Sequence, residues 1–178
     1  MLATLSQTDA GGLSAGFASV YGMWDELVTR ASTLDESLLH DQIDFEWSFV
    51  ETLRHLIYAT DCWFARVVLD DPQPFHAIAL SHSEARGQDP GIDLAANPTL
   101  SEVLDTRRAQ QARVRAFLET LTDADLDRQC RPTTPGNPPE ESFPLGAALG
   151  VIVNEEYWHH TYATRDLDVL TRGPVLDV

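Results

Sequence analysis

Hydrophobic residues recur every three or four positions in four segments of the chain, and this period predicts amphipathic α-helices. The four segments run from about Leu13 to Ser32, from about Glu46 to Leu69, from Thr99 to about Leu121, and from near Pro144 to Gly173-Pro174. No segment shows the alternation of a β-strand with comparable strength. The pattern therefore predicts an all-α fold.

Local signals mark the ends of these helices. Thr99 and Glu102 have the spacing of a capping box, and Pro144 suits the first turn of a helix. Residues 70–72, Asp-Asp-Pro, stop the second helix. The connection that follows, residues 71–98, is rich in Pro, Gly and polar residues, and a connection this long is either functional or disordered. We therefore expect one domain, residues 1–178, built as a four-helix bundle with a long crossover between helices 2 and 3.

Charge and composition exclude several classes of partner. The 28 acidic residues outnumber the 12 basic ones and give a formal net charge of -16. This balance argues against a nucleic-acid surface and against anionic membranes, since both need clustered Lys and Arg. No signal peptide, membrane-spanning run or disulfide framework is visible, and the two cysteines, Cys62 and Cys130, form no CxxC motif. A cytoplasmic location is the expectation that fits these observations.

The sequence EEYWHH, residues 155–160, places two glutamates and two histidines inside the fourth helix. Three pairings about one turn apart are open: Glu155–His159, Glu156–His160 and Glu156–His159. At about 100° per residue, Glu156 lies at the centre of the apolar stripe and His160 about 40° from it. By the same count His159 lies about 60° away on the far edge of the stripe, and Glu155 about 100° away. Glu156 and His160 are therefore the pair predicted to point inward.

A buried carboxylate is costly unless it has a partner. Two readings of the Glu–His pair are open: a simple hydrogen-bonded pair, or two ligands of a divalent cation with a third from another helix. His55 is the histidine in the middle of the second predicted helix, and its side of that helix carries small or polar residues such as Ala59 and Cys62. Such a lining is typical of a cavity wall; a solvent-facing histidine is the alternative.

The stretches WSFVETLRHL and, about a hundred residues later, NEEYWHHTYATRDL resemble the DinB-like superfamily, which includes the mycothiol-dependent maleylpyruvate isomerases of actinobacteria. The resemblance covers most of the chain. It implies a four-helix bundle, commonly dimeric, with one histidine ligand from the second helix and two ligands spaced by four in the last helix. The implied metal ligands are His55, Glu156 and His160. Zinc is the first expectation for the metal, with nickel and iron as alternatives.

The resemblance also implies a reaction. Three protein ligands leave a coordination position open for water or a thiolate, and the relatives use low-molecular-weight thiols such as mycothiol. We therefore expect a metal-dependent transferase or isomerase that uses such a thiol on a small electrophilic substrate. A metal-dependent hydrolase and a non-catalytic, dimeric metal- or ligand-binding bundle are the alternatives. Catalytic and thiol-binding residues cannot be assigned from the sequence, although His76 and His82 in the crossover are candidates for contact with the metal or the substrate.

Overall fold

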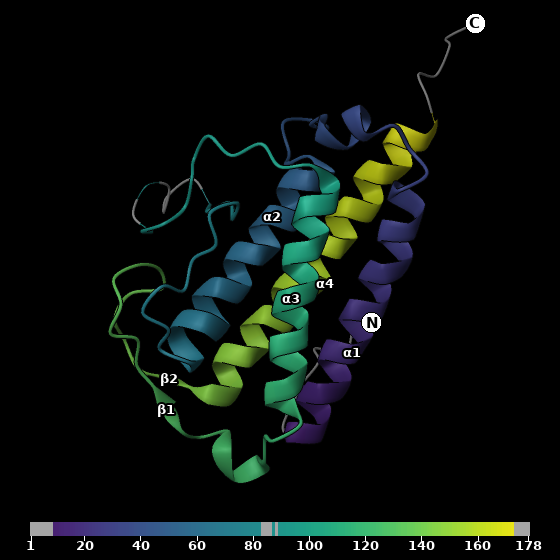
Figure 1. The fold of residues 1–178 in the computed structure, drawn as a ribbon. Helices are drawn as coiled ribbons and strands as arrows, with labels where there is room; N and C mark the ends of the chain where they lie inside the picture. The colour runs from purple at the N-terminus through teal and green to yellow at the C-terminus, as the bar shows by residue number, and fades with distance from the viewer. Residues whose placement is uncertain (1–8, 83–86, 88, 173–178) are drawn as a thin grey trace, which may run out of the picture.

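Four long helices form a bundle (Figure 1). The computed structural model describes residues 9–82, 87 and 89–172. The main helices are α1 (Ala10–Ala31), α2 (Phe49–Thr60), α3 (Leu100–Leu118) and α4 (Leu145–Arg172). Shorter elements are the 3₁₀ helices Glu36–His40 and Asp123–Asp125, the π-helical stretch Asp61–Val68, and strands β1 (Gln129–Cys130) and β2 (Phe143–Pro144). This confirms the predicted four-helix bundle with a long connection between α2 and α3; the predicted helix end at Gly173-Pro174 lies outside the described residues.

Side-chain caps define where the helices begin. The predicted capping box at the start of α3 is present, because Thr99 accepts from the backbone N–H of Glu102 and Glu102 accepts in return. Ser48 and Glu51 form a second capping box, which starts α2 at Phe49. Since each box satisfies backbone donors that the helix leaves free, it fixes the first turn.

The second helix therefore begins three residues later than its hydrophobic pattern predicts. Asp44 and Phe45 have positive φ angles of 51° and 65°, so the chain makes a tight turn before the helix. Trp47 lies in this turn rather than on the helix. At its other end α2 continues as the π-helical stretch, whose wider turns carry Cys62 and Trp63.

Helix α4 packs against both α1 and α2, and α2 packs against α3. The buried core divides into two hydrophobic clusters along the bundle, one around Trp24, Leu53 and Val103 and the other around Phe17 and Leu149. The α2–α3 crossover and the loop between β1 and β2 lie on the same side of the bundle, beside α2 (Figure 1). Two segments without regular structure thus come together over the outer face of α2.

Strands β1 and β2 form a short antiparallel pair, in which Gln129 pairs with Pro144 and Cys130 with Phe143. The sequence did not predict this pair, because two residues are too few to show a strand pattern. Within the described residues, none of the helices has the length and apolar character needed to cross a lipid bilayer.

Candidate metal centre

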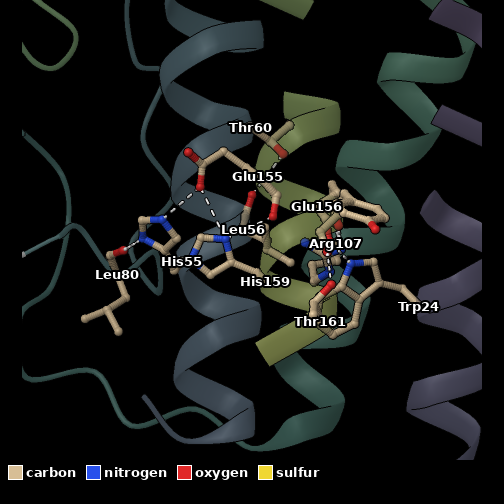
Figure 2. A network of polar contacts seen from close by, with 11 residues as sticks. Trp24, His55, Leu56, Thr60, Leu80, Arg107, Glu155, Glu156, His159 and Thr161 are labelled. Carbon is tan, nitrogen blue, oxygen red and sulfur yellow. Dashed lines mark hydrogen bonds and ion pairs between the residues drawn. The ribbon is translucent and has the colours of Figure 1, made fainter. Parts of the chain in front are cut away.

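His55 from α2 meets Glu155 and His159 from α4 (Figure 2). Glu155 and His159 are one helical turn apart, so their side chains lie next to each other on α4. The Glu155 Oε2 atom is 3.5 Å from His55 Nε2 and 3.3 Å from His159 Nδ1. One nitrogen or oxygen from each of the three residues lies within 4.8 Å of the others, and among the described residues this is the one group of its kind. Two packed helices thus bring three metal-binding side chains together.

Backbone carbonyls set the tautomer of both histidines. His55 Nδ1 is 3.2 Å from the carbonyl oxygen of Leu80, and His159 Nδ1 is 2.9 Å from that of Glu155. A carbonyl oxygen can only accept, so each Nδ1 carries the proton. In the neutral imidazole Nε2 then has a free lone pair, and this Nδ1–H···O=C arrangement is the usual support of a metal-binding histidine.

The charges at the centre also suit a cation. The neighbouring His55 imidazole lowers the pKa of Glu155, so its carboxylate is ionised at neutral pH. Burial lowers the pKa of the His159 imidazole and favours its neutral form. One carboxylate and neutral imidazole nitrogens are a donor set that binds divalent transition metals. Since the Glu155 side chain is 34% exposed, the centre is reachable from solvent.

A cavity of about 380 Å³ adjoins the three side chains. Its lining comprises Trp47, His55, Tyr58, Ala59, Cys62, Trp63, His82, Asn137, Pro138, Glu155 and His159. The expectation that the side of α2 carrying His55, Ala59 and Cys62 forms a cavity wall is therefore confirmed. Its size is within the range of small-molecule sites.

Trp47 covers the two histidines from the turn before α2. Its ring centroid is 4.4 Å from that of His55 and 6.0 Å from that of His159. Glu51 lies one turn before His55 in α2, but its carboxylate accepts from the Ser48 backbone and the Gln42 side chain. His55 is oriented by the Leu80 carbonyl of the crossover instead.

The structure does not bring Glu156 and His160 to His55, which corrects the ligand set expected from the sequence. The Glu156 carboxylate is buried against Arg107 of α3, with Arg107 Nη2 at 3.0 Å and 2.8 Å from its two oxygens (Figure 2). His160 packs edge-on against Trp24 of α1, at 5.3 Å between ring centroids. Burial raises the pKa of Glu156 and lowers that of His160.

The reason for the difference is the position of the centre relative to the core. The apolar stripe of α4 faces the bundle interior, where Arg107 satisfies the central glutamate. The three residues of the centre lie instead where α2 and α4 meet at the side of the bundle. The residues of α4 that face α2 there are at or beyond the edge of its apolar stripe. The edge position of His159 was visible in the sequence. Its pairing with Glu155 could have been found by asking which Glu–His pair one turn apart can face a histidine on a neighbouring helix.

His76 and His82, the two other histidines considered, also have defined positions. The backbone N–H of His76 donates to the buried Asp61 carboxylate at 2.8 Å, which ties the crossover to the end of α2. Burial raises the pKa of Asp61 to about 7. Unlike His76, His82 lines the cavity. Both cysteines are free and buried.

The fold and the centre define a helical bundle with a candidate metal site between two of its helices. The profile of the DinB superfamily matches residues 20–163, and the chain belongs to that superfamily. Among solved structures, the chain is similar to YfiT from Bacillus subtilis, described as a probable metal-dependent hydrolase with an unusual four-helix bundle topology. The two are 18% identical, the match covers 90% of this chain and 89% of the other, and the TM-score is 0.62, so the likeness shows a shared fold. The comparison with curated proteins gave no match.

Proposed function

We propose that His55, Glu155 and His159 bind one divalent metal ion and that the chain is a metal-dependent enzyme acting on small molecules. The observation that carries this proposal is the convergence of the three side chains within 4.8 Å on the wall of a cavity of about 380 Å³. Three protein ligands correspond to the open coordination of catalytic zinc sites. When bound, such a metal supplies a Lewis acid that lowers the pKa of a coordinated water or thiol.

The residues of the chain have separate tasks in this proposal. His55 and His159 present Nε2 lone pairs, and the Leu80 and Glu155 carbonyls hold their rings in place. Glu155 supplies the negative charge that offsets part of the metal charge. Trp47 lies against both imidazoles.

We propose a low-molecular-weight thiol such as mycothiol as the co-substrate, used to transfer the thiol to an electrophile or to isomerise a substrate through a thiol adduct. The resemblance to the maleylpyruvate isomerase type supports this choice. Water as the nucleophile is the second candidate, and the description of YfiT as a probable metal-dependent hydrolase favours it. Zinc is the proposed metal, and nickel or iron would suit the same donors.

One assay separates these alternatives. The zinc-loaded protein is incubated with small electrophiles and activated esters, with and without mycothiol, and products are measured by mass spectrometry. Thiol adducts that depend on zinc and disappear in His55→Ala support the transferase, and thiol-independent ester cleavage with the same dependence supports the hydrolase. Zinc binding without turnover in either arm would leave a metal-binding bundle, and a protein that binds no zinc would overturn the proposal.

We also propose that the chain forms a homodimer. Trp158, Tyr162 and Val169 are spaced by four and seven residues on one side of α4, and each is about half exposed. An exposed apolar stripe of this kind is typical of an interaction surface. Light scattering should report a dimer for the wild type and a monomer for Trp158→Glu combined with Tyr162→Glu; a wild-type monomer would contradict the proposal.

A further inference from the structure

A buried arginine holds the loop between β1 and β2, residues 131–142. Arg66, on the π-helical stretch after α2, is fully buried. Its Nε donates to the carbonyl of Thr134 at 2.8 Å, and its Nη1 donates to that of Pro138 at 2.6 Å. Burying a charged guanidinium is costly unless it is hydrogen-bonded. Since Arg66 makes these bonds to the backbone, it fixes the course of the loop rather than any one side chain.

A buried aspartate of the crossover holds the same loop from another direction. The Asp89 carboxylate accepts from the backbone N–H of Asn137 at 2.8 Å and from the Tyr58 hydroxyl at 2.9 Å. Gly136 lets the loop approach this carboxylate closely. A Cβ there would lie 2.9 Å from Asp89 Oδ1 and 2.8 Å from the Phe75 ring. The loop, the crossover and α2 are thus joined at one point.

Asn137 is the polar residue that this anchored loop places on the cavity wall, next to Pro138. Its Nδ2 donates to His82 Nε2 at 3.3 Å, and a second N–H on the same nitrogen remains. Among the described residues, Asn137 Oδ1 has no hydrogen-bond partner. A loop position held by two buried charged residues presents a side chain in a fixed place, which is what specific binding requires.

The electrostatics of the lining favour an uncharged partner. Glu155 is in the wall, the Asp89 carboxylate lies behind Asn137, and the described lining residues include no lysine or arginine. A carboxylate beside Asn137 would face the negative charges of Glu155 and Asp89, whereas the guanidinium of Arg66 makes its hydrogen bonds to the Thr134 and Pro138 carbonyls. A carboxamide offers a donor and an acceptor, which complement the remaining N–H of Asn137 and its Oδ1, unpaired among the described residues.

We propose that Asn137, assisted by His82, is a specificity-determining residue that binds an uncharged amide-like group of the substrate while another part of the substrate reaches the metal centre. This inference rests on the proposed function, because it places the metal and Asn137 on one cavity. It narrows the substrate class to small molecules that carry a metal-binding or reactive group and a neutral group with both a donor and an acceptor.

The test uses the zinc-loaded full-length chain and a set of hydroxamic acids as zinc-binding probes, measured by calorimetry. Each probe carries a chain of one to four methylene groups that ends in a carboxamide, a carboxylate or an isopropyl group of similar shape. At one chain length the carboxamide should bind about 3- to 10-fold more tightly than the other two, as expected for one net hydrogen bond. Asn137→Ala should remove this preference, so that the three end groups bind with similar affinity at that chain length.

The controls separate the inference from the proposed function. Asn97→Ala changes an exposed asparagine outside the cavity and should keep the preference. Asn137→Ala keeps the backbone N–H that donates to Asp89. If Asn137→Ala lowers the melting temperature, Asn137→Ser is measured as a second variant, and it should also lose the preference for the carboxamide. No carboxamide preference at any length, or a preference that survives in both variants, would overturn the inference. Failure to bind zinc or acetohydroxamate at all would instead overturn the proposed function.

Discussion

Neighbouring glutamates on α4 have different tasks in this structure, and removing their charges one at a time should separate metal binding from stability. Glu156 is 1% exposed and Arg107 is 4% exposed, so Glu156→Gln leaves a buried guanidinium without its counter-charge. Breaking a buried pair in this way costs about 3–5 kcal/mol. Glutamine keeps one acceptor oxygen for Arg107, so the loss of stability should be near the lower end of this range. At about 2–4 °C per kcal/mol for a chain of this length, the melting temperature should fall by roughly 6–12 °C.

Glu155→Gln should change stability little and weaken zinc binding. Glu155 is one-third exposed and its pairs with the histidines are screened by solvent, so the loss of stability of the metal-free protein should stay below about 1 kcal/mol. Its charge is part of the proposed metal centre, so zinc retained after dialysis against a chelator should fall sharply. Thermal unfolding of the metal-free proteins and elemental analysis give both readouts. The reasoning is refuted if Glu156→Gln loses zinc while Glu155→Gln retains it.

Three further predictions concern the surroundings of the centre. Burial raises the pKa of Asp61 to about 7, so between about pH 4 and pH 7 the folded state holds a proton that the unfolded state has released. This proton stabilises the folded state at low pH. As the pH rises towards 7 the free energy of unfolding therefore falls, by up to about 1.4 kcal/mol per pH unit. Asp61→Asn should therefore flatten the fall in melting temperature between about pH 5 and 7, and an unchanged profile would contradict the assignment. Gly136→Ala places a Cβ against the Phe75 ring and should cost about 1–3 kcal/mol in urea unfolding, whereas Gly150→Ala, with nothing within 4 Å of its Cβ, should be neutral or stabilising. Nickel should quench tryptophan fluorescence mainly through Trp47, so Trp47→Phe should lose most of the quenching and Trp158→Phe should keep it; equal quenching in both would exclude Trp47 as the cover of the centre.

The helices of this fold could be predicted because their signals are local. The hydrophobic period and the Thr99–Glu102 capping box depend on residues three or four apart, and both appear in the structure. The start of α2 was missed by three residues because Trp47 continues the apolar pattern while the Ser48–Glu51 box sets the boundary. The hydrogen bonds of the capping box, and not the hydrophobic pattern, therefore determine where α2 begins.

The candidate centre could be predicted in part. His55 and a Glu–His pair one turn apart on the last helix follow from the sequence, whereas the choice between Glu155–His159 and Glu156–His160 does not. That choice depends on Arg107, a residue of α3 whose partner is fixed by packing between distant helices. The loop of Asn137 is held by Arg66 and Asp89 from two other segments, and no short-range pattern in the sequence reports such contacts.

The central claim is that one metal ion binds between α2 and α4 at His55, Glu155 and His159. An anomalous difference map from crystals of the zinc-loaded protein tests it most directly. The account predicts one strong peak at about 2.0–2.2 Å from one ring nitrogen of each histidine and from a Glu155 oxygen. A peak beside Glu156 and His160 instead, or no peak on this cavity, would contradict the claim.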